Sequence, residues 1–592
     1  MRHTLPQVVI GLATTFSAVL ILDRPAFGQT PPTGFVSKLG QEIDMRSGSR
    51  ILEDELNANN HVILPDASSP VPGGSTVPQI QLRGGNLQVN DPALDYIQIF
   101  PRFRPFVYAT QSETSAAASG RNIVVTYNTS AGIHLIPNPS GPGLIADQVL
   151  LSGFSTSNDD GQTWKSGFIP NSVAGAFTFG DPSVGVDRHG VFYFANLADD
   201  VTHGTIQVNK STDGGVTWSP GVIVQEDDNS DKDWLAVGPD PVNKNQDNVY
   251  VTWTSFQPAA CELRFGRSTD GGATWSARTI YVPTGNPNPA FPQNCLTFTN
   301  PVVDQITGTL YVPFLHFSNS DQDFIQMLIS DDAGDTFRFA TFNIPGAPDA
   351  TVMPVTQPGE LTACGGANIR LTVHGTANAG PGMFGFPRYV NASRMTLQPA
   401  IAVRNGQVYL AWNNSTSLVF GAGTGSNILY IGSADGGKTW TAPQIVNPSV
   451  TGDVQHVLPS LAIDQDPNDV HITYYTQHSN GSIDLDMANS HDGGNTFPSS
   501  RTVRVTSTSF DLPPTNIPLS NKPTFNATNY DRQIAVCYAL GEYQSVTTAN
   551  GSVYAAWGDM RNLITEPVNS LNPISGQTHP QEDVFFQKVK AQ

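Results

Sequence analysis

Acidic side chains at the ends of expected strands are the residues of this sequence that could carry chemistry. Glu113, Asp181 and Asp233 each stand near the start of an apolar strand pattern. Carboxyl groups gathered around a depression can donate a proton, clamp sugar hydroxyls or hold a cation. We take these three acids as candidate catalytic residues. The candidate substrate-binding residues are Arg264, His316, Glu542, Asp559 and Arg561. Capping of strand ends is the alternative role for each of them, because backbone groups there need polar partners.

A second set of aspartates lies in an eight-residue pattern, Ser-x-Asp-x-Gly-x-Thr followed by Trp or Phe. In a turn, an Asp side chain accepts hydrogen bonds from nearby backbone N–H groups, Gly adopts angles that other residues resist, and the ring packs beneath the hairpin. We expect these aspartates to shape turns rather than to react. They are Asp159, Asp213, Asp270, Asp332, Asp435 and Asp492.

The spacing of these boxes predicts a repeated four-stranded unit. They recur roughly every 54 to 62 residues, apart from one gap of about 103. A hairpin pattern, often opened by Pro, lies between them, as in 181–187 followed by 191–195. Seven such hairpins with six boxes predict an all-β propeller of seven blades of four antiparallel strands, with each box joining the third strand to the fourth. Six blades are the alternative, with one end hairpin as an accessory ribbon. Helix should be scarce.

The expected domain boundaries follow from this count. We predict a signal peptide at 1–28, an N-terminal extension at 29–105 and the propeller at 106–592, with a Gly- and Pro-rich insertion at 345–396. The last blade lacks a box and an outer strand, and an open strand edge invites aggregation. We predict that an N-terminal strand at Tyr96 to Phe103 completes it. A ligand site is expected on the loop face, which lies opposite the boxes.

Four cysteines form an even set, which is typical of disulfides in an exported chain. Three pairings are possible. We favour Cys261 with Cys295, within one blade, and Cys364 with Cys537, joining the two longest insertions. Neither a Cys/His pattern with zinc spacing nor an EF-hand-like loop occurs, so we predict no metal site and no cofactor, with Ca²⁺ bound by the acids as the open alternative.

The N-terminal sequence indicates the compartment of the protein, and the net charge indicates which partners are unfavourable. A basic start, an apolar run from Val8 to Leu22 and the sequence Ala26-Phe27-Gly28 predict a signal peptide cut after Gly28, with an uncleaved anchor as the alternative. No later stretch approaches about 18 apolar residues, so no membrane span is expected after signal removal. The net charge of -20 repels phosphate backbones and argues against nucleic acid. We expect a monomer that is secreted, periplasmic or at the cell surface.

The boxes resemble those of the sialidase superfamily, also called BNR or Asp-box repeat proteins, over roughly residues 106–592. The resemblance implies a propeller, but a shared fold does not assign chemistry. In sialidases three arginines grip the substrate carboxylate, an Asp is the acid/base, and a Glu activates a Tyr nucleophile. The segments around Glu113, Asp231 to Trp234 and Trp557 to Arg561 are similar to exported bacterial proteins called sialidase-like.

The sequence departs from the sialidase pattern in three respects. Phe103-Arg104-Pro105 is the nearest match to the first arginine segment but lacks its Ile, and Arg264, Arg388 and Arg561 stand in no matching motif. Glu542 directly precedes Tyr543, and strand neighbours point to opposite faces. Sialidases are also expected to have six blades.

Two functions therefore remain open from the sequence. The leading hypothesis is an exported sialidase-like propeller that engages a glycan or glycoprotein on its loop face, as a glycoside hydrolase if the acidic ring includes a proton donor. The contrasting hypothesis is a non-catalytic propeller that binds carbohydrate or protein. Three arginines converging over the axis would favour sialidase action, whereas two facing acids would favour hydrolysis of another glycan.

Overall fold

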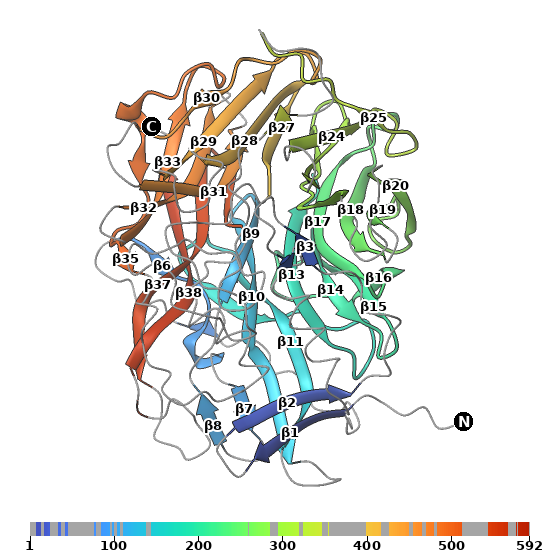
Figure 1. The fold of residues 1–592 in the computed structure, drawn as a ribbon, viewed down its shortest axis with the longest axis vertical. Coiled ribbons are helices and arrows are strands. Elements are labelled where there is room, and N and C mark those ends of the chain that lie inside the picture. The colour runs from blue at the N-terminus through green and yellow to red at the C-terminus, as the bar shows by residue number, and fades with distance from the viewer. Residues whose placement is uncertain are drawn as a thin grey trace.

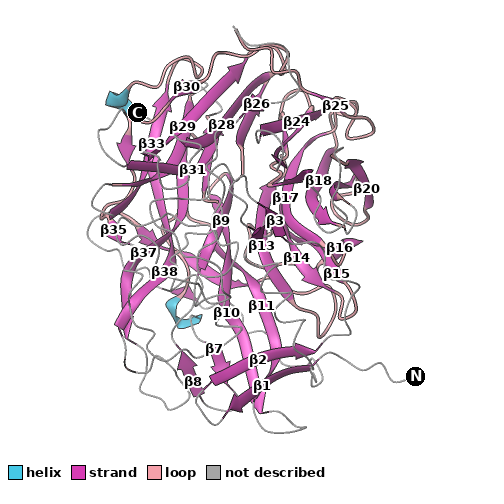
Figure 2. Ribbon diagram, in the orientation of Figure 1, coloured by secondary structure: helices cyan, strands magenta, loops and turns pink. Residues whose placement is uncertain are grey.

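The fold is taken from a computed structural model of the chain. It describes residues 85–94, 111–137, 144–257, 260–283, 294–318, 324–345, 398–415, 425–448, 454–464, 469–478, 482–511, 543–565, 576 and 578–590, together with strands at 7–13, 17–23, 34–36, 42–44, 76–77, 97–99, 103–106 and 353–354. This part of the chain is all-β. Its helices are two 3-10 turns, η1 (Pro92–Leu94) and η2 (Ser499–Arg501) (Figure 2).

From β9 onward the strands form antiparallel units, each named below by its innermost strand. The first three are β9 (Gln111–Ser119), β10 (Asn122–Pro137), β11 (Leu144–Ser157) and β12 (Trp164–Phe168); β13 (Thr178–Val186), β14 (Phe192–Asp199), β15 (Gly204–Ser211) and β16 (Val222–Glu226); and β17 (Ser230–Pro239), β18 (Asp247–Phe256), β19 (Cys261–Ser268) and β20 (Ser276–Tyr281). The short turns between partners set the order in which they pair.

The later units follow the same order with shorter outer strands. They are β21 (Asn294–Thr297) and β22 (Val302–Val303) with β23 (Leu310–Ser318), β24 (Phe324–Ser330), β25 (Arg338–Phe339) and β26 (Met353–Pro354); β27 (Ala400–Arg404), β28 (Gln407–Ser415), β29 (Gly425–Ser433) and β30 (Gln444–Ile445); β31 (Val454–Ile463), β32 (Val470–Gln477), β33 (Ser482–Ser490), β34 (Val503–Arg504) and β35 (Phe510–Asp511); and β36 (Ser545–Ala549), β37 (Ser552–Thr565) and β38 (Thr578–Lys590).

The units are arranged around a common centre, as in a β-propeller. Neighbouring inner strands contact each other in the order β9, β13, β17, β22, β27, β31 and β36, and β36 contacts β9 again. Figure 1 shows β9, β13, β17, β27 and β31 closest to the centre and the outer strands at the rim. Because the chain of contacts returns to its start, the inner strands enclose an axis.

An N-terminal strand pairs with the last unit, but it is not the predicted one. It is β6 (Leu87–Gln88), which pairs with Phe585 and Phe586 of β38. The predicted segment Tyr96 to Phe103 contains β7 (Ile97–Ile99), which pairs with β10, and ends at β8 (Phe103–Phe106), which pairs with β7. The prediction of the closing segment was therefore wrong. Asn90 explains why the 85–94 segment lies along β38. Its side chain donates a hydrogen bond to Asp583 and accepts one from the N–H of Val584.

The remaining N-terminal strands pair with each other or with the outer side of the first unit. β1 (Gln7–Ala13) pairs with β2 (Ser17–Asp23) and with β11, β3 (Gly34–Val36) pairs with β4 (Glu42–Asp44), and β5 (Thr76–Val77) pairs with β12. The predicted signal peptide coincides with β1 and β2 and stays a prediction.

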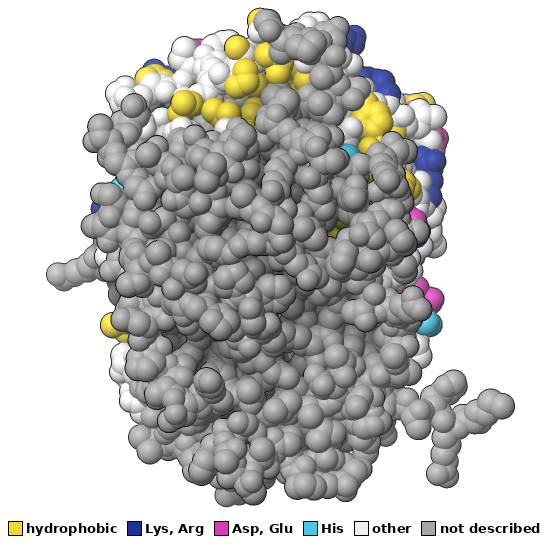
Figure 3. Space-filling view, in the orientation of Figure 1, with side chains coloured by type: hydrophobic (Ala, Val, Ile, Leu, Met, Phe, Trp, Pro, Cys, Tyr) yellow, Lys and Arg dark blue, Asp and Glu magenta, His cyan; other side chains and the backbone are white. Residues whose placement is uncertain are grey.

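Large aromatic side chains fill the space between units. Trp164, Trp253, Trp412 and Trp557 are almost completely buried. Burying such a side chain stabilises the fold by about 2–3 kcal/mol. Near the upper edge of Figure 3 hydrophobic side chains gather above β28 to β30, and Lys and Arg side chains lie at the upper right, beside β20 and β25.

Each box closes the turn after the third strand of its unit. In the box of β19, Ser268 Oγ donates to Asp270 Oδ1 at 2.8 Å, and the Thr274 N–H and hydroxyl donate to the same carboxylate at 2.9 and 2.6 Å. The Gly272 N–H donates to Ser268 Oγ at 2.9 Å. These bonds lower the pKa of Asp270 to about 2. Carboxylates with the same Ser and Thr donors are Asp159, Asp213, Asp332, Asp435 and Asp492.

A disulfide joins Cys261 to Cys295 with a Cα–Cα distance of 5.2 Å. It links the start of β19 to β21, so it fastens one unit to the next rather than two strands of one blade. Cys364 and Cys537 lie outside the described residues, as does most of the 345–396 insertion.

Candidate functional site

The loop-face ends of several inner strands carry a buried residue with left-handed backbone, which in most of them lies at a bulge. The ladder skips residues between Gly180 and Ser183, between Asp231 and Trp234, and between Val457 and Ser460. These left-handed residues have φ values between 52° and 58°, a region that non-glycine residues rarely adopt. They are Glu113, Asp181, Lys232, Phe298 and Leu458, which we call the bulge ring.

The bulge explains the proline noted at the start of the strand patterns. Pro182 and Pro459 directly follow the left-handed residues Asp181 and Leu458. A bulge leaves a residue unpaired in the ladder, and proline has no N–H to pair. In the β17 unit the corresponding residue is Asp233, so a carboxylic acid stands where two other units carry a proline.

Hydrogen bonds connect the charged members of the ring from one unit to the next. Asn128 on β10 donates to the Glu113 carboxylate, and its own Oδ1 accepts the Asp181 N–H at 2.7 Å. Asp181 Oδ2 in turn accepts the Lys232 N–H at 3.2 Å. Glu113, Asp181 and Lys232 are all buried. The bulges therefore join three charged residues of separate units in one network, through the side chains of Glu113 and Asp181 and the backbone N–H of Lys232.

Asp233 lies beside this network with an unusual environment. It is 1% exposed, and neither carboxylate oxygen receives a hydrogen bond from another described residue. Burial raises the pKa of Asp233 well above its usual range, and the neighbouring Asp181 carboxylate raises it further, against a smaller opposite effect of Lys232. Asp181 Oδ1 also lacks a hydrogen-bond partner among the described residues. The raised pKa favours the neutral, protonated form of Asp233 over its carboxylate.

Aromatic side chains form the other side of the ring. The Lys232 Nζ atom lies 4.0 Å from the centre of the Tyr543 ring and 5.4 Å from that of Phe298. Trp234 packs edge-on against Tyr543 at 4.8 Å between ring centres. Both Trp234 and Tyr543 also line a cavity of about 170 Å³ between the inner strands. A cavity of this size accommodates a group about as large as a single ring.

A second cavity continues along the axis away from the loop face. It has a volume of about 270 Å³ and is lined largely by Val, Ile and Leu side chains of β22, β27, β31 and β36, with Gln305 and Arg404 nearby. Val302, Ile401, Leu461 and Val546 line both cavities. The second cavity therefore has a largely aliphatic lining, and the charged residues of the bulge ring line neither cavity.

The other predicted residues have partners other than the three acids or lie outside the described chain. Arg264 on β19 pairs with Glu262, with Nε and Oε2 2.9 Å apart. His316 on β23 is buried, and its Nδ1 atom lies 3.1 Å from Gln326 Oε1. Glu542 is not among the described residues. Arg264 and His316 therefore meet partners on their own sheets.

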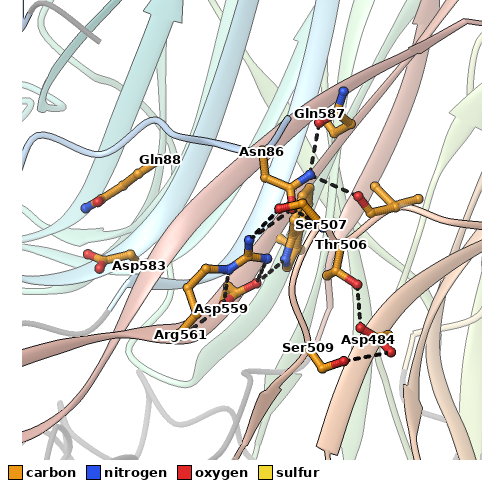
Figure 4. Close-up of polar contacts among 12 residues, drawn as sticks. Asn86, Gln88, Asp484, Thr506, Ser507, Ser509, Asp559, Arg561, Asp583 and Gln587 are labelled. Carbon is orange, nitrogen blue, oxygen red and sulfur yellow. Dashed lines mark hydrogen bonds and ion pairs between the residues drawn. The ribbon is translucent and has the colours of Figure 1, made fainter. Parts of the chain in front are cut away.

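Asp559 and Arg561 form a separate cluster on β37, shown in Figure 4. Arg561 donates through Nε to Asp559 Oδ1 at 2.9 Å, and through Nη1 to Asn86 Oδ1 at 3.0 Å and Ser507 Oγ at 3.1 Å. Its guanidinium carbon lies 4.3 Å from the centre of the Phe585 ring. Arg561 therefore ties the β36 unit to the 85–94 segment and to the loop after β34.

Asp583 belongs to the same region and was not predicted from the sequence. It accepts hydrogen bonds from Asn562 at 2.7 Å, Asn90 at 2.8 Å and Gln581 at 3.0 Å. Burial raises the pKa of Asp583 to about 6, although these donors oppose the shift. Asp583 could not be predicted because its hydrogen bond to Asn90 joins residues that are 493 positions apart in the sequence.

The sequence also missed Lys232, Asn128 and the aromatic pair Trp234 and Tyr543 as site residues. One signal for Lys232 was present, because a charged pair, Lys232-Asp233, stands where other units carry a residue followed by proline. Asn128 lies in the middle of β10, and nothing in the sequence around it marks it as a site residue.

Metal sites and membrane-spanning helices concern here only the residues that the structure describes. No group of three or more His, Cys, Asp or Glu side chains in that part of the chain has the arrangement of a metal site. No helix within it is long and apolar enough to cross a membrane.

Comparison with known families places the chain. The model of the BNR repeat-like domain matches residues 187–530, more than half of the sequence. The chain belongs to the BNR repeat-like domain family. This agrees with the resemblance carried by the boxes. No curated protein matches this BNR chain at a significant level.

Solved structures give distant likenesses to the BNR chain. The Hadza microbial sialidase Hz136 is 14% identical, with 89% of this chain and 98% of that chain covered and a TM-score of 0.33. A polysaccharide lyase PL25 ulvan lyase is 11% identical over 82% and 93%, with a TM-score of 0.40. A protein of unknown function from Dyadobacter fermentans is 14% identical over 71% and 96%, with a TM-score of 0.37. At these identities and TM-scores the likeness does not extend to an activity.

Proposed function

We propose that this chain binds a glycan at the bulge ring and cleaves a glycosidic bond there, with Asp233 as proton donor. One observation carries the proposal: Asp233 is buried without a hydrogen bond from another described residue, and its pKa is raised. Glycoside hydrolysis needs a carboxylic acid that is still protonated near neutral pH, so that it can protonate the leaving oxygen.

The surroundings of Asp233 suit the rest of the task. Asp181 and Glu113 supply carboxylates close by, and a second carboxyl group serves as base or nucleophile in most glycosidases. Trp234 and Tyr543 present aromatic surface beside the cavity, which favours the apolar face of a sugar ring. Asp181 is the better candidate for the second role, because its Oδ1 atom has no hydrogen-bond partner among the described residues.

The contrasting function is glycan or protein binding without turnover. It is favoured by the hydrogen bonds that tie Glu113 to Asn128 and Asp181 to Lys232, since these bonds give both acids a structural role. The two functions differ in whether Asp233 transfers a proton.

Fold and compartment complete the proposal. The closed order of inner-strand contacts supports seven blades over residues 106–592, closed by β6 from the N-terminal extension at 29–105. The Cys261–Cys295 disulfide suits an oxidising compartment and so supports export, with residues 1–28 removed. We propose a monomer. N-terminal sequencing of the mature protein tests the cleavage after Gly28.

The decisive experiment compares leaving groups. Turnover of a panel of fluorogenic and nitrophenyl glycosides is measured for the wild type, Asp233→Asn and the control Glu226→Gln, an exposed acid on β16. Loss of a general acid should lower kcat on poor leaving groups by roughly 10²- to 10⁴-fold. Dinitrophenyl glycosides need little protonation and should lose far less. Equal loss on both kinds of substrate, or no turnover of any glycoside by the wild type, would favour the binding function.

A further inference from the structure

The first cavity, of about 170 Å³, combines polar and aromatic side chains next to the bulge ring. Leu458 of the bulge ring lines it, and so does Trp234, the residue directly after Asp233. The described lining residues carry amide, hydroxyl, aromatic and aliphatic side chains, and none of them is charged. A ligand in this cavity therefore meets hydrogen-bonding groups that are neutral.

Several of these polar groups are already used by the fold. Ser115 Oγ accepts the Val184 N–H at 3.1 Å, which joins two neighbouring units. Gln544 Nε2 donates to the Thr473 carbonyl oxygen at 3.0 Å, and Gln544 Oε1 accepts the Thr473 hydroxyl at 3.0 Å. These side chains hold inner strands together, so they are engaged before any ligand arrives.

Gln398, just before β27, differs from them because its amide is only half used. It is 8% exposed and lines the cavity, and its Nε2 atom donates to the Thr299 carbonyl oxygen at 3.2 Å. Its buried Oε1 atom has no hydrogen-bond partner among the described residues. Because a carbonyl oxygen can only accept, the bond to Thr299 fixes which end of the amide is the oxygen.

Asn300 stiffens the same part of the wall. It also lines the cavity, and its Nδ2 atom donates to the Pro399 carbonyl oxygen at 3.0 Å. The two amides thus tie the segments before β22 and β27 to each other. A buried acceptor without a donor is unfavourable until a ligand or solvent supplies one. Gln398 Oε1 is therefore an acceptor held in place for a donor that enters the cavity.

The chemistry of this wall favours hydroxyl donors over charged ones. A neutral amide oxygen does not offset the cost of burying an ammonium or a carboxylate, whereas a hydroxyl needs no more than such an acceptor. A hydroxyl that displaces solvent from the amide also keeps the hydrogen bond. Trp234 and Tyr543 supply aromatic surface for the apolar face of a sugar ring. A hexose ring combines these two properties.

We propose that the first cavity is a subsite for an uncharged hexose unit, one hydroxyl of which donates a hydrogen bond to Gln398 Oε1. This ligand class rests on the proposed function, because both take a glycan as the ligand. It differs from the anionic substrate that the resemblance to sialidases implies. Gln398 is then the residue that determines specificity at this subsite.

Matched glycosides test the ligand class. Methyl glycosides of glucose, galactose and mannose are compared with those of the corresponding uronic acids, which carry a carboxylate in place of the C6 hydroxymethyl group. NMR titration of the wild-type protein gives the dissociation constants. In at least one series the neutral glycoside should bind at least roughly 10-fold more tightly, because the uronate must bury its charge. Equal or tighter binding of the uronate in every series, or binding of none of the neutral glycosides, would overturn the proposal.

Deoxyfluoro analogues locate the hydroxyl. In the series that binds, each hydroxyl is replaced in turn by fluorine, which cannot donate a hydrogen bond. Wild-type protein should bind one analogue roughly 3- to 10-fold less tightly than the parent sugar, the usual effect of a hydrogen bond between uncharged groups. Equal binding of all the analogues would overturn the proposal without any variant.

A pair of variants assigns that hydroxyl to Gln398. In Gln398→Met the difference between the parent sugar and the sensitive analogue should fall to about 1. Gln305→Met is the matched control, because Gln305 Nε2 also donates to backbone carbonyl oxygens, those of Val237 and Val303, but Gln305 lines the second cavity. This control should keep the wild-type difference. If Gln398→Met kept it too, the hydroxyl would be bound elsewhere and the assignment would fail. If Gln398→Met does not fold, the wild-type analogue series decides.

Turnover assays separate this proposal from hydrolysis. Binding of a neutral hexoside without turnover of any glycoside would support the subsite and overturn the hydrolase function. Turnover of nitrophenyl uronides in preference to nitrophenyl hexosides would support hydrolysis and overturn the subsite. Neither binding nor turnover would overturn both.

Discussion

The boxes and the bulge ring use the same residue type in opposite ways. Asp270 in a box is largely exposed and accepts bonds from Ser268 and Thr274, which lower its pKa to about 2. Asp233 at the ring is buried, receives no hydrogen bond from another described residue, and has a raised pKa. The comparison teaches that the number of donors around a carboxylate, rather than the presence of the carboxylate, separates scaffold from chemistry in this fold.

Turnover should show the largest difference between the two regions. Asp233→Asn should lower kcat by roughly 10²- to 10⁴-fold on a poor leaving group, because the proton donor is lost. Asp270→Asn lies on the opposite face and should leave kcat per folded molecule within about twofold. Steady-state assays of both variants, normalised to folded protein by circular dichroism, check the contrast. A comparable fall in both would mean that the box also contributes to the reaction.

Stability should show the reverse order. Asp270→Ala removes the acceptor of several hydrogen bonds in the turn, which should cost about 1–2 kcal/mol, as the loss of a helix cap does. Asp233→Asn removes a buried ionisable group and should leave the free energy of unfolding unchanged or higher at neutral pH. Urea unfolding monitored by tryptophan fluorescence measures both. Greater destabilisation by Asp233→Asn would assign a scaffold role to the ring acid.

The pH dependence of stability should differ in sign. The pKa of Asp270, Asp435 and Asp492 is about 2 in the fold, against 3.8 for an ordinary Asp, so their stabilisation is present above about pH 4 and lost as pH falls toward 2. The raised pKa of Asp233 makes the fold relatively less stable as pH rises past its unfolded value. Thermal unfolding from pH 2 to 9 should therefore show a shallower acid limb for Asp435→Asn and a flatter neutral limb for Asp233→Asn.

Asp583 provides an intermediate case with a smaller expected effect. It is as buried as Asp233 but has three side-chain donors, and its pKa is raised only to about 6. Asn90→Ala removes one donor and should raise the pKa of Asp583 further while costing about 1–2 kcal/mol. Chemical denaturation at pH 5 and pH 8 measures the change. An unaltered pH dependence would separate donor number from pKa and weaken the comparison.

The features that could be predicted from the sequence are those made by short-range contacts. The box hydrogen bonds join residues two to four positions apart, so the motif alone predicts both the turn and the role of Asp270. The Cys261 and Cys295 pair was also predicted, although it joins neighbouring units rather than two strands of one blade. The closing strand was misplaced because Asn90 meets Asp583 almost 500 residues later in the chain. The hydrogen bonds of the bulge ring could not be predicted for the same reason, because they join Asn128, Asp181 and Lys232 of three different units.

The most direct test of the comparison is a carboxyl titration. Protein with ¹³C-labelled Asp side chains is followed by NMR from pH 2 to 9, and the Asp233 and Asp270 signals are assigned from their loss in Asp233→Asn and Asp270→Asn. We predict that the Asp270 signal titrates near pH 2 and that the Asp233 signal keeps the shift of a protonated acid at pH values where other aspartates are ionised. An Asp233 signal that titrates at or below pH 4 would contradict the assignment of Asp233 as proton donor.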